Sequence, residues 1–381
     1  MSRIYFDNNA TTPVRSEVRE AILPYLGDVF GNPSSAHRVG EEAKNGLDLA
    51  REQVAGLFKT RAARIVFTSG GSEANNIAIW SAVSADPAKK HIISSQVEHA
   101  SVLEPLRFLA GYGYEIELLP VDSAGGLDLD RLSAALRPDT ALVSLMGANN
   151  ETGVLWPLAE ISGICQGKNV LLHCDGVQMV GKESLDLEAL GVDYFSVAGH
   201  KLHGPKGVGA LYARRNVPVK PLIMGAGQEQ GRRAGTENMP SIAGFGKACE
   251  LAKQGLTEYS KIGALRDFLQ QEIVKQIPDV IINGGTLPRL ANTLNVSFKY
   301  CSSAGMIQEL DARGVAVSGH SACHSGDLDP SHVLAAMRVP EDYLHGSLRI
   351  SLSSCNTRQE ADRFLALLPG IVARARQTFA A

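Results

Sequence analysis

The segment SVAGHKLHGPKG, residues 196–207, joins an apolar run to a polar turn rich in glycine. The run 194–198 has the composition of a buried strand, and Lys201 follows it directly. In open α/β sheets, ligands bind at the carboxyl ends of the strands, so this lysine stands where an active site is expected. Lys201 is therefore a candidate Schiff-base lysine. A solvated loop lysine is the simpler alternative, and Lys206, in the turn GPKG, competes for the role.

The rest of the middle of the chain alternates short apolar runs with amphipathic segments. Continuous apolar runs are typical of strands that are buried on both faces, and helices between them favour parallel pairing. We therefore predict an α/β fold whose mainly parallel, seven-stranded sheet is flanked by helices. The expected strands are 65–68, 91–95, 115–120, 140–146, 170–174, 194–198 and 207–212, and the helices include 73–83, 127–136 and 157–166.

A second block of structure is expected after a long helical region at 241–277. It contains short β-like runs at 293–298, 315–317 and 349–352, and helices at 331–337 and 359–376. Two domains are the natural expectation for 381 residues. We predict a large domain, residues 16–256. A smaller α+β domain would combine residues 1–15 and 257–381 and carry the loop around Cys323.

Composition and charge exclude several classes of protein. Lys and Arg number 37 and Asp and Glu 40, so the formal net charge is −3 and no basic field is available for nucleic acid or an anionic membrane. No apolar run approaches the ~18 residues of a membrane span, and no signal-peptide core is evident. The cysteines form no CxxC pair, which favours reduced thiols in a cytoplasmic protein. They are Cys165, Cys174, Cys249, Cys301, Cys323 and Cys355.

The segment TSGGSEANN, residues 68–76, has the pattern of an anion site. A strand ends, two glycines turn the chain, and a helix begins near Ser72 and Glu73. Backbone N–H groups at such a helix start can bind phosphate. The alternative is an ordinary strand-to-helix turn with a serine cap. No GK[ST] follows, so the segment is not a P-loop.

The segment LLHCDGVQ, residues 171–178, places Asp175 at the end of an apolar run. A carboxylate there is costly unless it is paired with a cation or with hydrogen-bond donors. By itself, Asp175 could be a helix N-cap or part of a surface salt bridge. Pyridoxal phosphate needs a lysine for its aldehyde, a phosphate site and an acid for its ring nitrogen. The three segments together favour that cofactor.

Two further polar residues follow apolar runs. His99, in SQVEHAS, could stack on a flat cofactor ring or cap a helix. Asn150, in GANNETG, could reach the cofactor or substrate or simply form a turn. Both alternatives stay open for each residue.

Cys323 lies between two histidines in SGHSACHSG, residues 318–326. Its thiol could bind a metal, stay inert, or act as a nucleophile. A zinc site would draw its ligands from His320, Cys323, His324 and His332. Their spacing is irregular and only one is a thiolate, so we predict no firm metal site.

Ten segments, taken in order, resemble the motifs of NifS-like cysteine desulfurases, which belong to the class-V aminotransferase group of pyridoxal-phosphate enzymes. The resemblance extends from residue 4 to about 375 and implies fold type I. The segments are DNNATTP (7–13), FGNPSSAH (30–37), TSGGSEANN, VEHASV, ANNETG, HCDGVQ, AGHKLHGPKGVGALY, GRRAGTEN (231–238), SGHSACHSGDLDPSHVL and HGSLRISL (345–352).

The resemblance implies a role for each matching residue. Lys201, Cys323 and His99 would be catalytic, with Lys201 holding pyridoxal phosphate, Cys323 acting as the nucleophile and His99 stacking on the ring. Asp175 would pair with the ring nitrogen and Gln178 would bond the ring hydroxyl. Phosphate would be bound by Gly71, Ser72 and His200, and by Thr236 from the partner subunit. Asn150 would contact both cofactor and substrate. Arg349 would bind the substrate carboxylate, helped by Asn8 and Ala10.

The implied activity is removal of sulfur from L-cysteine, which yields L-alanine and a persulfide on Cys323. The sulfur would supply iron–sulfur cluster assembly or other sulfur-containing cofactors. A homodimer is implied, with a sulfur-acceptor protein such as an iron–sulfur scaffold as a further partner, and Cys323 could transiently bind a cluster. The alternatives of the same fold are a selenocysteine lyase and a cysteine C–S lyase. A different class would be a zinc- or iron–sulfur-binding accessory protein.

Overall fold

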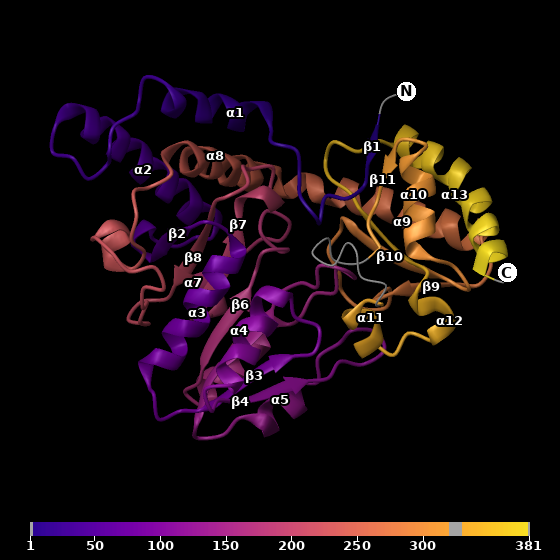
Figure 1. Ribbon diagram of the computed structural model, residues 1–381, viewed down its shortest axis with the longest axis horizontal. Coiled ribbons are helices and arrows are strands. Elements are labelled where there is room, and N and C mark those ends of the chain that lie inside the picture. Colours follow the sequence, from indigo (N-terminus) through magenta and orange to yellow (C-terminus); the bar gives the residue numbers. More distant parts are fainter. Residues whose placement is uncertain (1–2, 320–329, 380–381) are drawn as a thin grey trace.

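A seven-stranded sheet forms the centre of the larger part of the molecule (Figure 1). The computed structural model describes residues 3–319 and 330–379. The strand order is β2–β8–β7–β6–β5–β3–β4. β8 is antiparallel to both of its neighbours and the other four pairings are parallel, which confirms the predicted mainly parallel sheet. The strands are β2 (Ile65–Thr68), β3 (His91–Ser95), β4 (Glu115–Leu119), β5 (Thr140–Met146), β6 (Leu171–Asp175), β7 (Tyr194–Ala198) and β8 (Gly209–Ala213).

Both faces of this sheet are apolar and covered by helices. Successive residues of a strand point to opposite faces, so Ile65 and Phe67 pack in one core cluster and Val66 in another. The first cluster includes residues of α2, α6 and α8, and the second includes residues of α3 and α4. The helices of this part are α1 (Ser16–Ile22), α2 (Arg38–Leu57), α3 (Gly71–Ala85), α4 (Ala100–Ala110), α5 (Leu129–Ala135), α6 (Leu158–Gly167), α7 (Leu187–Leu190) and α8 (Met239–Gly255).

The remaining strands form two small sheets in the second lobe of Figure 1. One sheet has the order β12–β10–β9 and the other pairs β1 with β11, so the indigo N-terminal strand lies beside an orange strand from late in the chain. The elements are β1 (Ile4–Tyr5), α9 (Tyr259–Gln276), β9 (Val280–Asn283), β10 (Thr293–Phe298), α10 (Ser303–Asp311), β11 (Val315–Ala316), α11 (His332–Ala336), α12 (Glu341–Leu344), β12 (Ser347–Ser351) and α13 (Arg358–Phe379).

The second lobe has a core cluster of its own. Ile4 and Phe6 pack in it with buried residues from Ile262 to Val372. Two residues of the N-terminal segment therefore share a core with the C-terminal part of the chain, and the domain boundaries given above stay a prediction. Val333 and Leu334, however, pack in the core of the large sheet. The helix α11 therefore packs on the core of the large sheet, although it lies in the C-terminal part of the chain.

Short 3₁₀ turns connect several elements. They are η1 (Leu23–Leu26), η2 (Ala62–Arg64), η3 (Gly199–Lys201), η4 (Gln228–Gly231) and η5 (Leu256–Glu258). The turn η5 divides the long helical region expected at 241–277 into α8 and α9. Gly255, with its low helix propensity, ends α8 at this point.

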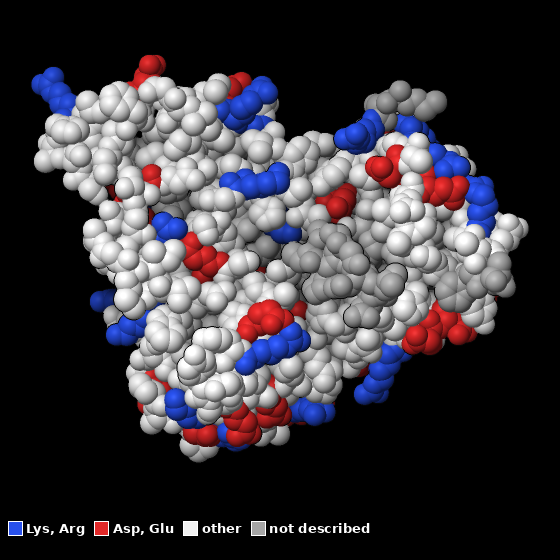
Figure 2. Space-filling view, viewed as in Figure 1, with Lys and Arg blue, Asp and Glu red and all other residues white. Residues whose placement is uncertain are grey.

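No helix within the described residues is both long enough and apolar enough to cross a bilayer. On the face shown in Figure 2, basic and acidic side chains are interspersed, and neither sign forms a continuous field.

Candidate active site

A cavity of about 210 Å³ lies at the carboxyl ends of β5, β6 and β7. Strand ends meet at this edge because the three strands are parallel and in register, with Met146 opposite Asp175 and Asp175 opposite Ser196. The cavity brings together most of the residues singled out from the sequence. Its lining includes Ala10, Gly71, Ser72, His99, Asn150, Asp175, Gln178, His200, Lys201 and Arg349.

Lys201 is held at the cavity by the N-terminal segment. Its Nζ donates hydrogen bonds to the carbonyl oxygens of Asn9, at 2.5 Å, and Ala10, at 3.0 Å. The backbone and hydroxyl of Thr12 both donate to the His200 carbonyl oxygen, which ties η3 to the same segment. Lys206, the competing lysine, is exposed and does not line the cavity. The structure therefore offers Lys201 as the amine of this site.

Asp175 is a buried carboxylate whose hydrogen-bond donors are neutral. It is 7% exposed, its Oδ1 accepts from the backbone N–H of Val177 at 3.0 Å, and its Oδ2 accepts from Asn75 Nδ2 at 2.8 Å. No helix begins at this position, so Asp175 is not an N-cap. No Lys, Arg or His of the described residues forms an ion pair with it. A cationic ligand would compensate this charge.

The start of α3 borders the same cavity and suits an anion. Gly71 and Ser72 line the cavity, and no described side chain caps this helix. Its first backbone N–H groups are therefore available to a phosphate. A Cβ on Gly71 would lie 2.6 Å from Val177 Cγ2, so only glycine leaves the neighbouring side chain in place. The sequence placed the helix start near Ser72, one residue from the observed start.

His200 borders the cavity as a neutral imidazole. Burial, reinforced by the charges of Lys201 and Lys206, lowers its pKa to about 4. Its Nδ1 lies 3.2 Å from the hydroxyl oxygen of Thr11. At neutral pH this ring can donate a hydrogen bond to an anion without carrying charge itself.

His99 both caps a helix and lines the cavity. Its Nδ1 accepts from the backbone N–H of Ser101 at 3.1 Å, at the start of α4. Asn75 Nδ2 donates to Ser101 Oγ and to Asp175 Oδ2, both at 2.8 Å. This chain of contacts links His99 to Asp175 through two residues that the sequence did not single out individually, although both lie in the quoted motifs.

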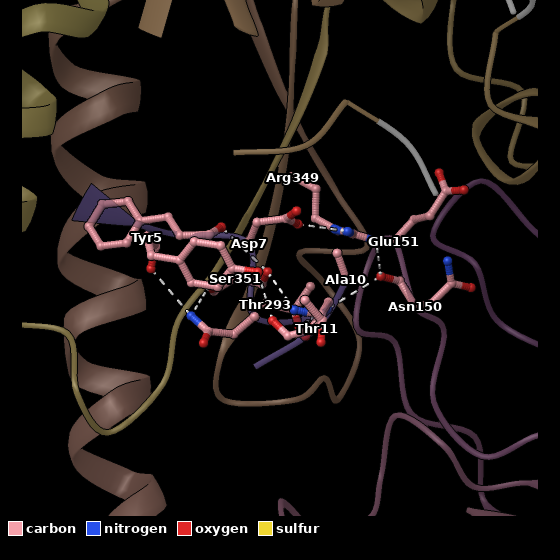
Figure 3. Close-up of polar contacts among 12 residues, drawn as sticks. Tyr5, Asp7, Ala10, Thr11, Asn150, Glu151, Thr293, Arg349 and Ser351 are labelled. Carbon is pink, nitrogen blue, oxygen red and sulfur yellow. Dashed lines mark hydrogen bonds and ion pairs between the residues drawn. The ribbon is translucent and has the colours of Figure 1, made fainter. Parts of the chain in front are cut away.

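Arg349 reaches the cavity from β12 and is 1% exposed. Figure 3 shows its guanidinium between Asp7 and the backbone of Asn150. The two terminal nitrogens donate to Asp7 Oδ1, at 2.9 Å, and to the Asn150 carbonyl oxygen, at 3.0 Å. The remaining Nε has no partner among the described residues. A buried donor of this kind is suited to a substrate carboxylate.

Asn9 is the central residue that the sequence missed. It is 1% exposed and lines the cavity, and its carbonyl oxygen accepts from both Lys201 and Gln178. The neighbouring Asn8, named from the sequence, instead donates to the Ser351 carbonyl oxygen at 2.9 Å and borders a smaller hollow. Both asparagines occur in DNNATTP, and nothing in that motif distinguishes which one turns inward.

Thr236 is exposed and does not line this chain's cavity. The segment before it is held by two ion pairs. Arg51 contacts the buried Glu229 through both carboxylate oxygens at 2.7 Å, and Arg233 contacts Glu73 at 2.9 Å. Thr236 is therefore presented outward by an anchored segment.

Cys323, His320 and His324 lie outside the described residues. His332 lies just after that gap, and its Nε2 is 3.0 Å from the carbonyl oxygen of Glu98. Within 3–319 and 330–379, no three His, Cys, Asp or Glu side chains are grouped to bind a metal ion.

Glu98, next to His99, is a fully buried acid. Its Oε1 accepts from Ser95 Oγ at 2.8 Å and from the backbone N–H of Met146 at 2.9 Å. Burial raises the pKa of this carboxyl to about 8, despite these two hydrogen bonds, and the nearby charge of Asp175 raises it further. Glu98 is therefore mostly protonated at neutral pH.

The residues around the cavity fit pyridoxal phosphate. Lys201 provides an amine for the aldehyde, and the start of α3, which no described side chain caps, provides an anion site. Asp175 provides a buried negative charge that a cationic ring would neutralise. The Nε of Arg349, which has no partner among the described residues, adds a site for a carboxylate at the same cavity.

Comparison with known proteins gives similarity over nearly the whole chain. The sequence matches the aminotransferase class-V family over residues 4–364. A relative named cysteine desulfurase 2, from Trichormus variabilis, is 48% identical over 376 residues, which is 99% of this chain and 94% of the relative. A relative named cysteine desulfurase IscS, from Dictyoglomus turgidum, is 46% identical over 98% of this chain and 95% of the relative.

Solved structures are also similar to this chain over nearly its whole length. A structure described as a NifS-like protein matches with a TM-score of 0.92 and 38% identity, covering 98% of this chain and 100% of that one. A NifS-like protein from Rickettsia africae matches with a TM-score of 0.88 and 33% identity, covering 97% and 99% of the two chains.

Proposed function

The chain belongs to the aminotransferase class-V family and is a cysteine desulfurase, and we propose that its cavity binds pyridoxal 5′-phosphate through Lys201 and Asp175. The observation that carries this proposal is the buried carboxylate of Asp175, which has neutral donors and shares a cavity with an amine and an uncapped helix start. A protonated ring nitrogen would compensate that charge. Within residues 3–319 and 330–379, neither a salt bridge nor a helix cap accounts for this buried carboxylate.

We assign the cofactor contacts residue by residue. Lys201 binds the aldehyde carbon, and Asp175 pairs with the ring nitrogen. Gln178 donates to the ring oxygen, His99 covers the ring face, and Asn150 lies beside both cofactor and substrate. The phosphate is bound by Gly71, Ser72 and His200, and by Thr236 of the partner subunit.

When bound, pyridoxal phosphate supplies an aldehyde that condenses with amines and a ring that accepts electrons released at a substrate carbon. The protein supplies the remaining chemistry. Arg349 binds the carboxylate of L-cysteine through Nε, while Asp7 and the Asn150 carbonyl hold the guanidinium in place. Lys201 takes the Cα proton on Nζ, which its two carbonyl partners keep directed at the cavity.

Cys323 is assigned as the sulfur acceptor of this step. Its thiolate attacks the substrate sulfur, so a sulfur–sulfur bond forms while the bond between substrate Cβ and sulfur breaks. The electron pair of the broken bond stays with the carbon skeleton, which takes one proton at Cβ, recovers one at Cα from Lys201 Nζ, and leaves as L-alanine. The sulfur remains on Cys323 as a persulfide. This chemistry requires a reduced thiol, so we infer a reducing compartment such as the cytoplasm.

We also infer a homodimer. Apolar side chains at 222–224 are exposed, with Met224 79% exposed, and an apolar groove of about 570 Å³ beside the cavity includes Trp80 and Phe108. A second copy covering this groove would bring a Thr236 toward the phosphate site. Light scattering of the purified protein should give twice the chain mass, and a monomer at micromolar concentration would contradict the inference. A sulfur-acceptor protein such as an iron–sulfur scaffold would then receive the persulfide, and Cys323 could transiently bind a cluster there.

Borohydride reduction of the holoenzyme tests the cofactor assignment. The yellow protein should bleach, and peptide mapping should place the reduced cofactor on Lys201 and not on the exposed Lys206. Lys201→Ala should abolish the label, whereas Lys206→Ala should keep it. A label on another lysine, or a colourless protein, would overturn the proposed site.

A further inference from the structure

Lys182 is a buried lysine that lies outside the cavity and has no part in the mechanism above. It is 6% exposed, and no carboxylate of the described residues pairs with it. Burial lowers its pKa well below the usual range, and the charges of Lys201 and Arg349 lower it further. An apolar side chain of similar length would fill this space without the cost of burying an amine. What Lys182 adds is its N–H donors.

Those donors reach two residues that line the cavity. Lys182 Nζ lies 3.0 Å from Gln178 Oε1 and 3.2 Å from Asn9 Oδ1. Gln178 Nε2 in turn donates to the Asn9 carbonyl oxygen at 3.0 Å, the same oxygen that accepts from Lys201. Lys182, Gln178 and Asn9 therefore form a closed hydrogen-bonded group, which is joined to Lys201 through the Asn9 carbonyl oxygen.

This arrangement permits one orientation of the Gln178 amide. Lys182 offers N–H groups on one side, and the Asn9 carbonyl offers only an acceptor on the other. A reversed Gln178 amide would place its N–H groups against those of Lys182 and its oxygen against the Asn9 carbonyl oxygen. Both hydrogen bonds would then be lost. In the observed orientation Nε2 uses one hydrogen for Asn9 and keeps the second for the cavity.

We propose that Lys182 is a positioning residue that fixes the Gln178 amide with its nitrogen toward the ring oxygen of the cofactor. The inference rests on the proposed function, because it needs pyridoxal phosphate in the cavity. A ring oxygen that carries negative charge requires a donor, and an amide free to turn would present its oxygen part of the time. Lys182 thus acts on the cofactor through Gln178 and touches neither cofactor nor substrate.

The test is a pH titration of the visible absorbance of the bound cofactor, without substrate. Removing a donor leaves more negative charge on the ring oxygen. That charge stabilises the proton on the neighbouring nitrogen, which is Lys201 Nζ bonded to the cofactor. Lys182→Met should therefore raise the titration midpoint by about 0.5–1 pH unit, a 3–10-fold change in proton affinity. Gln178→Ala should shift it in the same direction, and the double variant should shift no further than Gln178→Ala alone.

Two variants separate this role from general effects of charge and folding. Lys182→Arg retains N–H donors, and the small hollow of about 50 Å³ lined by Lys182 can take the added atoms, so it should restore the wild-type midpoint. Lys206→Met removes a nearby exposed charge that makes no contact with Gln178 and should leave the midpoint within about 0.2 unit. If Lys182→Met does not fold, Lys182→Gln, whose shorter side chain leaves Gln178 Oε1 without its donor, should give the upward shift.

An unchanged midpoint in Lys182→Met, or a shift that adds to that of Gln178→Ala, would overturn the inference. Wild-type protein that shows no visible absorbance after reconstitution would instead overturn the proposed function. The two failures are therefore distinguishable in one experiment.

Discussion

Replacing Asp175 with asparagine should weaken cofactor binding while leaving the empty protein nearly as stable as the wild type. In the cofactor-free chain the carboxylate has two neutral donors, Val177 N–H and Asn75 Nδ2, and no cation. The new amide keeps the bond from the Val177 N–H and loses at most the bond from Asn75 Nδ2. Asn75 Oδ1, which has no partner within the described residues, can turn to accept from it. Removal of a buried charge offsets the remaining loss.

The expected magnitudes differ between the two states. The hydrogen bond from Asn75 to the carboxylate contributes about 1.5–3 kcal/mol, and removal of the buried charge offsets most of it. The free energy of unfolding of the cofactor-free variant should therefore change by about 1 kcal/mol or less. The hydrogen bond between a carboxylate and a ring N–H⁺ contributes about 1.5–3 kcal/mol. At about 1.4 kcal/mol per factor of ten, the dissociation constant of pyridoxal phosphate should rise by a factor of about 10–100.

Asp193→Asn is the matched control. Asp193 is also a buried carboxylate, 2% exposed, but it accepts from Arg214 at 2.6 Å and from the backbone N–H of Leu172 at 2.8 Å, away from the cavity. Breaking this ion pair should destabilise the cofactor-free protein by about 1–3 kcal/mol without changing cofactor affinity. Urea unfolding of both cofactor-free variants and absorbance titration with pyridoxal phosphate measure the two quantities.

One pair of results would show that Asp175 does not bind the cofactor. If Asp175→Asn bound the cofactor as tightly as the wild type and lost stability as Asp193→Asn does, the carboxylate would be a structural group. The cavity would then not be organised around a cationic ring.

Three further predictions concern other residues of the site. Glu98 has a pKa raised to about 8, so the stability that its protonated form contributes is fully present below about pH 4.5 and is lost as pH rises through about 8. Urea unfolding of Glu98→Gln should not show this loss of stability, and pH profiles of wild type and variant that run parallel would contradict the prediction. Arg349→Gln should raise the KM for L-cysteine by about 10–100-fold with a smaller change in kcat, and an unchanged KM would remove Arg349 from substrate binding. Gly71→Ala places a Cβ 2.6 Å from Val177 Cγ2 and should weaken cofactor binding by about 1–3 kcal/mol, whereas unaltered affinity would place the phosphate elsewhere.

The sheet could be predicted closely from the sequence because both of its faces are buried. Strands such as β5 and β7 are fully buried along their length, so their residues form continuous apolar runs that need no alternation to be recognised. The reversed direction of β8 could not be predicted in this way. Its residues Gly209–Ala213 are as buried as those of the parallel strand β7, and the direction of a strand does not change its amino-acid composition.

Prediction of the site succeeded for residues at strand ends and failed for residues placed by tertiary contacts. Lys201 and Asp175 follow apolar runs, so topology alone brings them to one edge. Asn9 lies in the N-terminal segment, and its inward position depends on contacts with Thr293 and Ser351, far along the chain. From the sequence, Lys182 has the pattern of an ordinary loop lysine. Its burial depends on contacts with Gln178 and with the distant Asn9, which the sequence pattern does not indicate.

The central claim is that sulfur leaves L-cysteine by transfer to Cys323 in a protein that holds pyridoxal phosphate on Lys201. The direct measurement is alanine release from L-cysteine by Cys323→Ala, alongside its cofactor absorbance and its activity on selenocysteine. We predict loss of alanine release with the cofactor spectrum and affinity retained. Alanine release from L-cysteine at the wild-type rate would contradict the claim and assign the activity to a lyase that does not use this thiol.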